Sequence, residues 1–245
     1  MAMTVDNPAA RLHQILKEAL AHNPGEVCRD VWTSVLRVEP GDHPLLTRRL
    51  AEVMGLPREI AVGMTEHYPD ETAMLSHWRG QVDSAFVKLH LAAQWNSFSS
   101  LIDAHAMNYL SNTAKMLQMV VAYKPADRPK LEEIRESIHA LLSDVRNSDL
   151  DDALKLTVTR YLANLANSID EYFITGVMPV LDAVNAACGR VLTDHDYREL
   201  LKGQTTIGEK IVEILENTAV VTTVAANLHE LAPLLESGWK LLGGA

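Results

Sequence analysis

Hydrophobic and polar positions alternate with a helical period along most of this chain. Between Asp70 and Tyr123 the pattern predicts helix throughout, with no proline and a single glycine, Gly80. Charged side chains are sparse in this segment: Asp70, Glu71, Arg79, Asp83, Lys88, Asp103 and Lys115. Since a solvated helix face normally carries Lys, Glu, Arg or Asp throughout, we expect this segment to lie at the centre of the fold.

The same segment is too long to remain one straight helix in a compact domain. It would extend about 80 Å at about 1.5 Å per residue, whereas a chain of this size has a radius of gyration of roughly 18 Å. Its apolar stripe also changes side, from Trp78, Val82, Ala85 and Leu89 to Leu91, Trp95, Ile102, Ala106, Tyr109 and Val120. We expect a bend or break, with a change of packing partner near residues 89 to 97.

The N-terminal region predicts shorter helices. Asn7 followed by Pro8 is typical of a helix start, and apolar residues recur at helical spacing until Pro24. Further helices are expected over about 26–37, over about 44–54 with its end at Gly55, and from Pro57 to near Pro69. These elements predict a small N-terminal helical subdomain at residues 1–69.

The C-terminal half predicts a helical hairpin. One helix carries a 3-4-3-4 apolar seam: Leu131, Ile134, Ile138, Leu141 and Val145. Ser148 and Asp151 then fit a capping pair, and the next apolar stripe continues to Gly176: Leu154, Val158, Tyr161, Leu165, Ile169 and Tyr172.

Shorter helices follow, over about 179–187, 194–202 and 206–217. The run Val220–Val224 has strand-like residues, although a lone strand would have no partner. Leu228, Leu231, Leu235, Trp239 and Leu242 indicate a docked amphipathic helix that kinks or begins at Pro233. No internal repeat is evident.

These segments together predict an all-α protein of roughly nine or ten helices. We expect a multi-helix bundle at residues 70–245, built around the long, bent central helix, with the N-terminal helical subdomain at 1–69. The 245-residue length and 47% hydrophobic content are sufficient for a full core, and the 5% aromatic content favours helices over a sandwich or barrel.

Charge and cysteine content narrow the function classes. The net charge of −10 argues against a nucleic-acid binder and against an anionic-membrane binder, because both need a basic surface. Cys28 and Cys188 are too few for a disulfide framework or a paired-cysteine zinc site. The sequence shows neither a leader pattern nor about 18 consecutive apolar residues. We therefore expect a cytoplasmic protein.

Two motifs suggest chemistry only superficially. The stretch Leu50–Pro57 resembles the first half of a helix-turn-helix, but the next apolar position, Ile60, falls one place early. A plain helical hairpin is favoured there. The stretch Gly203–Lys210 suggests a phosphate loop, but Glu209 displaces the lysine, so Thr206 with Glu209 is interpreted as a capping box.

Three carboxylate or histidine groups also receive a structural interpretation. Glu136 and His139 have di-iron spacing but no second such pair in the chain, so a solvated helix face is favoured. The stretch Asp194–Asp196 is interpreted as a helix start at Thr193 and Asp196. Asp149, Asp151 and Asp152 are interpreted as helix-start carboxylates, because divalent metals need several converging oxygens. No catalytic residue, metal or cofactor is assigned.

One polar face on the long helix is the candidate site. Its residues fall within a narrow arc: His90, Gln94, Ser97, His105, Asn108 and Asn112. Uncharged amides and hydroxyls suit a sheltered surface, which could be another helix of the chain, a protein partner or a pocket. His90 and His105 would lie about 22 Å apart on a straight helix, too far to share a metal.

Two functional hypotheses follow. The first is a non-enzymatic interaction or regulatory protein, with a protein partner or as a homo-oligomer that self-associates through the charge-poor face. The alternative is a helical enzyme or carrier with an internal pocket for a small, largely apolar molecule, in which His90 or His105 is a polar contact or a proton shuttle.

Overall fold

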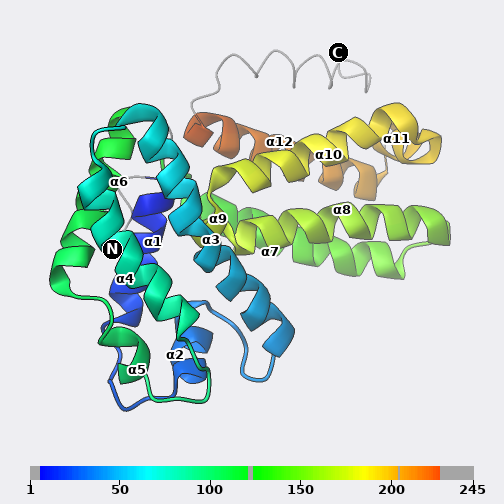
Figure 1. Cartoon of the computed structure of the whole chain (residues 1–245). Helices are drawn as coiled ribbons and strands as arrows, with labels where there is room; N and C mark the ends of the chain where they lie inside the picture. The colour runs from blue at the N-terminus through cyan, green and yellow to red at the C-terminus, as the bar shows by residue number, and fades with distance from the viewer. Residues whose placement is uncertain (1–5, 121–123, 204, 227–245) are drawn as a thin grey trace. The chain divides into compact units, whose positions relative to one another are not determined.

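The computed structural model describes residues 6–120, 124–203 and 205–226. Twelve α-helices and no β-strand are found in those ranges, so the expected all-α fold is confirmed. The chain divides into two compact units, residues 1–123 and residues 124–245 (Figure 1). The amphipathic helix expected over 228–242 lies outside the described residues.

The first unit contains six helices: α1 (Pro8–Ala19), α2 (Cys28–Val35), α3 (His43–His67), α4 (Thr72–Val87), α5 (Asn96–Ser99) and α6 (Ala104–Val120). Helix α1 packs against α3 and α6, and α4 packs against the same two helices. The expected start of α1 is confirmed, because Oδ1 of Asn7 accepts a hydrogen bond from the Ala10 N–H at 2.9 Å. The Asn7 amide also donates to the Ala114 carbonyl at 2.9 Å, which ties α1 to α6.

Helix α3 runs unbroken through two positions where the sequence predicted boundaries. Gly55 and Pro57 both lie inside it, so the expected end at residue 55 and new start at residue 57 are wrong. Leu56, Pro57 and Ile60 are buried, and this packing outweighs the weak helix propensity of proline and glycine. The stretch Leu50–Pro57 therefore lacks the turn that a helix-turn-helix needs.

The long central helix expected over 70–123 is broken. Helix α4 ends at Val87 and α6 begins at Ala104, with only the four-residue α5 between them. The break occurs where the change of packing partner was expected. Its cause is backbone pairing with a distant loop, through three hydrogen bonds of 2.7–2.9 Å: Cys28 N to Ala93 O, Arg29 N to Leu91 O and Trp95 N to Glu26 O.

An aromatic cluster fills the space inside this break. Trp95 and Phe98 stack with their ring centroids 4.8 Å apart, and the Trp32 ring meets both edge-on at 5.6 and 5.3 Å. Phe86 at the end of α4 completes the cluster at 5.7 Å from Trp32. Such aromatic pairs add to the stabilisation that comes from burial, so the end of α4 and the α5 turn are fixed by α2.

The boundary between the units also differs from the expected one. The sequence placed it between residues 69 and 70, which is the connection between α3 and α4. Those two helices pack against each other within the first unit, and the compact units divide at residues 123 and 124.

The second unit contains six helices: α7 (Arg128–Asn147), α8 (Asp152–Asp170), α9 (Tyr172–Thr175), α10 (Val177–Thr193), α11 (His195–Lys202) and α12 (Thr206–Ala226). Helices α7, α8, α10 and α12 form a four-helix arrangement in which each packs against two of the others. Helix α11 contacts α8, α10 and α12. The expected α7–α8 hairpin is confirmed, and its α7 seam is buried at all five positions: Leu131, Ile134, Ile138, Leu141 and Val145.

Several helix boundaries in the second unit differ from the expected ones because of local capping hydrogen bonds. Asp194, not Thr193, caps α11, because its Oδ1 accepts from the Tyr197 N–H at 3.1 Å. Thr205 hydrogen-bonds the Gly208 N–H at 3.1 Å at the start of α12, one residue before the expected cap. The strand-like run Val220–Val224 is part of α12, where the Thr222 hydroxyl donates to the Thr218 carbonyl at 2.8 Å.

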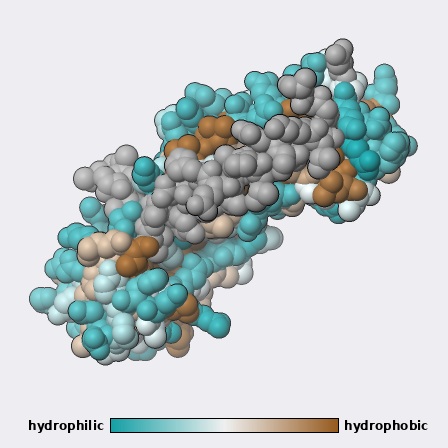
Figure 2. Space-filling model, turned by 90° about the horizontal axis from the view of Figure 1, so that it is seen from above, coloured by the Kyte–Doolittle hydropathy of each residue, from teal (hydrophilic) through white to brown (hydrophobic). Residues whose placement is uncertain are grey.

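The surface drawn in Figure 2 is mostly hydrophilic, with separate hydrophobic patches. Within the ranges that the structure describes, no helix combines the length and apolarity needed to cross a membrane.

Candidate functional site

The six residues of the expected polar face do not share one helix. His90 and Gln94 lie between α4 and α5, and Ser97 lies in α5. His105, Asn108 and Asn112 lie on α6, and all six side chains are exposed. The prediction that these six residues form one face of a single helix is wrong, because it assumed a helix without a break. Only the α6 residues share a helix surface, and their role as a contact surface stays a prediction.

Two of these residues border the buried Cys28. The Ser97 hydroxyl donates to the Gln94 carbonyl at 2.8 Å, and the Cys28 thiol lies 3.5 Å from the same carbonyl oxygen. Burial raises the pKa of the Cys28 thiol, so it stays protonated at neutral pH. The contact between the Cys28 thiol and the Gln94 carbonyl therefore helps to hold the 91–96 loop in place.

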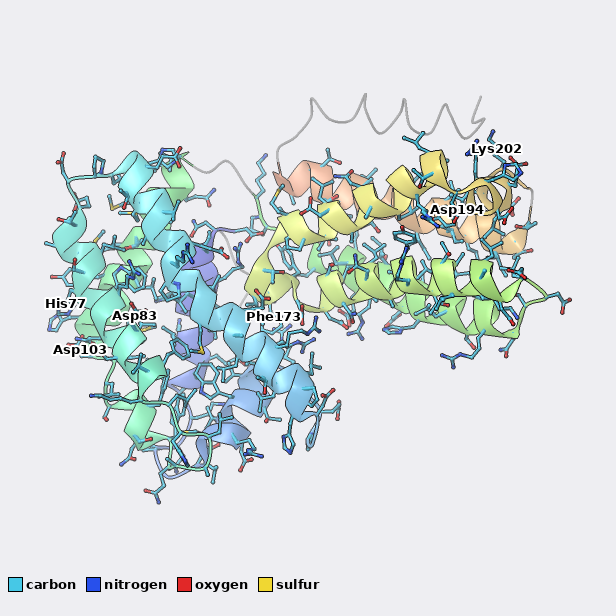
Figure 3. The ribbon with its side chains drawn as sticks, turned by 45° about the vertical axis from the view of Figure 1, so that its right-hand side comes forward. His77, Asp83, Asp103, Phe173, Asp194 and Lys202 are labelled. Carbon is cyan, nitrogen blue, oxygen red and sulfur yellow. The ribbon has the colours of Figure 1, made fainter. Side chains whose placement is uncertain are left out.

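A second polar group joins α4 to α6 (Figure 3). Asp103 caps α6 by accepting from the Ala106 N–H at 2.7 Å, and it accepts from the Gln81 side chain of α4 at 2.9 Å. His77 Nε2 lies 3.9 Å from the same carboxylate. The Gln81 hydrogen bond, followed by the Ala106 N–H, lowers the pKa of Asp103. The carboxylate is thus an ionised clamp between two helices.

The other candidate residues from the sequence lie apart from one another. Glu136 and His139 are exposed on α7. Asp151 caps α8 by accepting from the Ala153 N–H at 2.9 Å, as its helix-start interpretation predicted. Across the described ranges, no group of three or more His, Cys, Asp or Glu side chains is placed to hold a metal ion.

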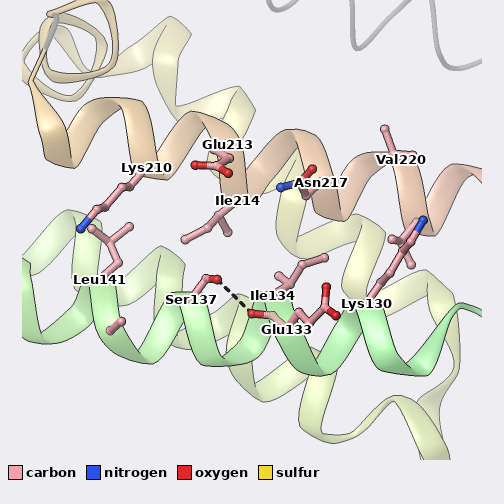
Figure 4. A pocket seen from close by; sticks show the side chains of 12 residues that line it. Lys130, Glu133, Ile134, Ser137, Leu141, Lys210, Glu213, Ile214, Asn217 and Val220 are labelled. Carbon is pink, nitrogen blue, oxygen red and sulfur yellow. Dashed lines mark hydrogen bonds between the residues drawn. The ribbon is translucent and has the colours of Figure 1, made fainter.

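The structure contains a groove of about 510 Å³ between α7 and α12, here named the α7/α12 groove (Figure 4). Its floor consists of four buried apolar side chains: Ile134, Leu141, Ile214 and Val221. Exposed side chains form its rim: Lys130, Glu133, Ser137, Ala140, Lys210, Glu213, Asn217 and Val220. Sequence reasoning did not identify this site.

The two walls of this groove repeat one another. Every lining residue of α7 has a counterpart 80 positions later on α12: Lys130 and Lys210, Glu133 and Glu213, Ile134 and Ile214, Ser137 and Asn217, Ala140 and Val220, Leu141 and Val221. The shared pattern Lys-x-x-Glu-Ile-x-Glu begins at residue 130 and again at residue 210. No internal repeat was expected from the sequence, and this short correspondence is the signal that could have found the groove.

The walls run in opposite directions. Lys210 Nζ lies 2.7 Å from Asp144 Oδ2 at one end, and the Lys124 N–H donates to the Ala225 carbonyl at 2.7 Å at the other. Lys210 lies across from Leu141, and Ile214 lies across from Ser137 (Figure 4). Antiparallel helices with equivalent residues are related by an approximate two-fold axis that passes through the middle of the groove.

The charges around the groove are incompletely paired. Lys210 forms an ion pair with Asp144, whereas the counterpart of Asp144 is Val224, which is 53% exposed. Lys130 therefore lacks the carboxylate that its equivalent has. Among the described residues, no ion-pair partner is found for Lys130, Glu133 or Glu213. These three groups are available to a partner.

The groove stays open because its rim side chains are small near the middle. The Ser137 hydroxyl is turned back to donate to the Glu133 carbonyl at 2.9 Å, and Ala140 follows one turn later. An apolar floor with a polar, partly unpaired rim matches the chemistry of helix-binding grooves.

Comparison of the chain with protein-family models, with curated proteins and with solved structures gives no match in any of the three.

Proposed function

We propose that this chain is a non-enzymatic interaction protein that self-associates and receives helical structure in the α7/α12 groove. The observation that carries the proposal is the combination of an apolar floor with three unpaired charged groups on the rim. Unpaired charges beside an exposed apolar side chain, here Val220 at 61%, favour association, because a partner can cover the apolar surface and match the charges at the same time.

The dimensions of the groove support a helical occupant. Its α12 wall extends from Lys210 to Val221, which is about 16 Å at about 1.5 Å per residue, or about three helical turns. The floor residues are seven positions apart on each wall, Ile134 with Leu141 and Ile214 with Val221. That spacing matches two turns of an occupant helix.

The α6 surface is a second proposed contact region. His105, Asn108 and Asn112 are exposed polar side chains without a carboxylate or ammonium group. Tyr109 beside them is 39% exposed. Tyrosine is enriched at interfaces, and few charges have to be desolvated there. We also propose a cytoplasmic location, which is supported by two free thiols at Cys28 and Cys188.

A second candidate function is a carrier of a small, largely apolar molecule. One observation favours it: the groove volume of about 510 Å³ falls within the range of roughly 300–1,000 Å³ for small-ligand pockets. His90 and His105, the polar contacts that this function was expected to use, do not line the groove. We rank it second for that reason.

Native mass spectrometry of the purified full chain tests these two functions. The interaction function predicts assemblies at whole multiples of the 27.1 kDa chain, with the same chain mass after denaturation. Additional mass that is lost on denaturation would show a bound ligand. That result would contradict the ranking of the interaction function above the carrier function.

A further inference from the structure

We propose that the occupant of the α7/α12 groove is a second copy of this chain, packed groove to groove, with α7 antiparallel to α7 and α12 antiparallel to α12 of the second copy. This inference rests on the proposed function and names the partner and the interface. Its basis is the approximate two-fold symmetry of the groove together with the positions of the unpaired charges.

The repeated walls make the groove self-complementary. An interface between two identical copies related by a two-fold axis places the same surface patch on both sides. Here each wall already packs against an antiparallel helix of similar pattern, because α7 and α12 carry identical residues at three of the six corresponding lining positions. A second copy extends that packing, so that α7 and α12 of one copy lie face to face on α7 and α12 of the other and form an antiparallel four-helix bundle.

Charge complementarity selects the orientation of the second copy. When α7 packs on α7, Lys130 lies across from Leu141 of the second copy, one turn from its Asp144. Within one chain, Lys210 likewise lies across from Leu141 (Figure 4) and forms its ion pair with Asp144. Lys130 thereby gains a carboxylate partner, which it lacks within the described part of its own chain because Val224 stands at the position equivalent to Asp144. The two-fold axis forms this contact twice in the dimer.

The α12 walls are compatible with the same orientation. Glu213 falls within one turn of Asn217 of the second copy, whose amide can donate to the carboxylate. Val220, which is 61% exposed, meets the aliphatic stem of Lys210 of the second copy. The other two-fold arrangement, α7 on α12, places Lys130 against Val220 and leaves the ammonium group without a carboxylate.

The available area is sufficient for a specific contact. Helices α7 and α12 have 20 and 21 residues, so each is about 30 Å long, and two helices side by side are about 20 Å wide. The face they form covers roughly 600 Å² per copy, at the lower end of about 600–1,000 Å² per partner in specific interfaces. A weak, concentration-dependent dimer is therefore expected.

Analytical ultracentrifugation of the full chain tests this interface. Val220→Lys adds a charge at the groove rim, and Val62→Lys is the matched control, because Val62 is 62% exposed on α3 of the first unit. We expect Val220→Lys to raise the dimer dissociation constant at least about tenfold and Val62→Lys to leave it unchanged. Circular dichroism checks that both variants keep the helical content of the wild type.

A second variant tests the orientation. Lys130→Glu places a carboxylate near Asp144 of the second copy and should weaken the dimer at least about tenfold at low salt, with a smaller effect at high salt. A dimer unchanged by both Val220→Lys and Lys130→Glu would overturn this interface while leaving the interaction function intact. A wild-type chain that stays monomeric would overturn both the interface and the self-association in the proposed function, and a wild-type monomer that carries a ligand mass would in addition favour the carrier function.

Discussion

Lys210 on α12 forms an ion pair with Asp144 on α7, with 2.7 Å between Nζ and Oδ2, and the equivalent pair at the other end of the groove is absent. The equivalent positions are Lys130 and Val224. Because the lysines occupy corresponding positions on the two walls, this difference identifies one end where the lysine is paired within the chain and one end where Lys130 has no carboxylate partner among the residues that the structure describes.

Val224→Asp should restore the missing pair. The new carboxylate would lie relative to Lys130 as Asp144 lies relative to Lys210. In that existing pair the Lys210 side chain is 45% exposed and the Asp144 side chain is 49% exposed. Exposed pairs contribute roughly 0.2–1 kcal/mol, so we expect a gain of about 0.3 kcal/mol in the free energy of unfolding. Urea denaturation at low and high salt measures it, with Val224→Asn as the uncharged control. An equal effect of both variants would contradict the pairing.

The two isoleucines of the groove floor should be energetically equivalent. Ile134 and Ile214 are exposed by 6% and 5% and occupy corresponding positions on the walls. Truncation of either to alanine should lower the free energy of unfolding by about 2–4 kcal/mol, because each leaves a cavity in the same kind of packing. Denaturant unfolding of the two variants checks this. A cost below about 1 kcal/mol at one site alone would show that the walls are not equivalent.

The aromatic cluster should be necessary for the break between α4 and α6. Trp95 is fully buried and contacts Trp32 and Phe98. Trp95→Ala should destabilise the first unit by about 3–5 kcal/mol, the cost of removing a large buried aromatic side chain. Hydrogen exchange of the 25–29 and 91–96 backbone amides measures the effect directly. Unchanged protection of those amides would contradict the role of the cluster.

The stability of the first unit should decrease in acid through Asp103. Its pKa is lower in the folded chain, chiefly because of the Gln81 hydrogen bond, so the folded state binds fewer protons at this carboxylate than the unfolded state. The stabilisation is therefore complete above the ordinary pKa of about 3.9 and is lost as the pH falls through the lowered value. Urea denaturation over the range in which carboxylates titrate, from about pH 6 to about pH 2, measures this loss of stabilisation.

Asp103→Asn is the control for that pH dependence. It keeps an oxygen that can accept from the Ala106 N–H and removes the titrating group. Its free energy of unfolding should be lower than that of the wild type at neutral pH and should depend less on pH. Parallel curves for the two proteins would exclude Asp103 as a source of the acid sensitivity.

Local signals in the sequence predicted much of the helical structure. Asn7 as the cap of α1 and the buried seam from Leu131 to Val145 depend only on residues within one or two turns, and both are confirmed. The break after α4 depends instead on hydrogen bonds from Cys28 and Arg29 to residues more than 60 positions away. No periodicity within 70–123 contains that information, so the continuous polar face was predicted on a helix that does not exist.

Long-range pairing also explains why the groove was missed. Lys130 and Lys210 belong to helices separated by α8, α9, α10 and α11, and each wall alone has an ordinary amphipathic pattern. The shared pattern is visible in the sequence, but only the packing of α7 against α12 shows that the two patterns face each other and that their charges are unequally paired. The strand-like run Val220–Val224 was misleading for a similar reason, since burial against α7 and α10 favours helix there.

The most direct test of groove-mediated self-association is sedimentation velocity of the wild type, Val220→Lys and Val62→Lys over a common concentration series. We predict that the wild type and Val62→Lys form dimers of the 27.1 kDa chain as the concentration rises, whereas Val220→Lys remains monomeric over the same range. Identical sedimentation of all three proteins would contradict the account.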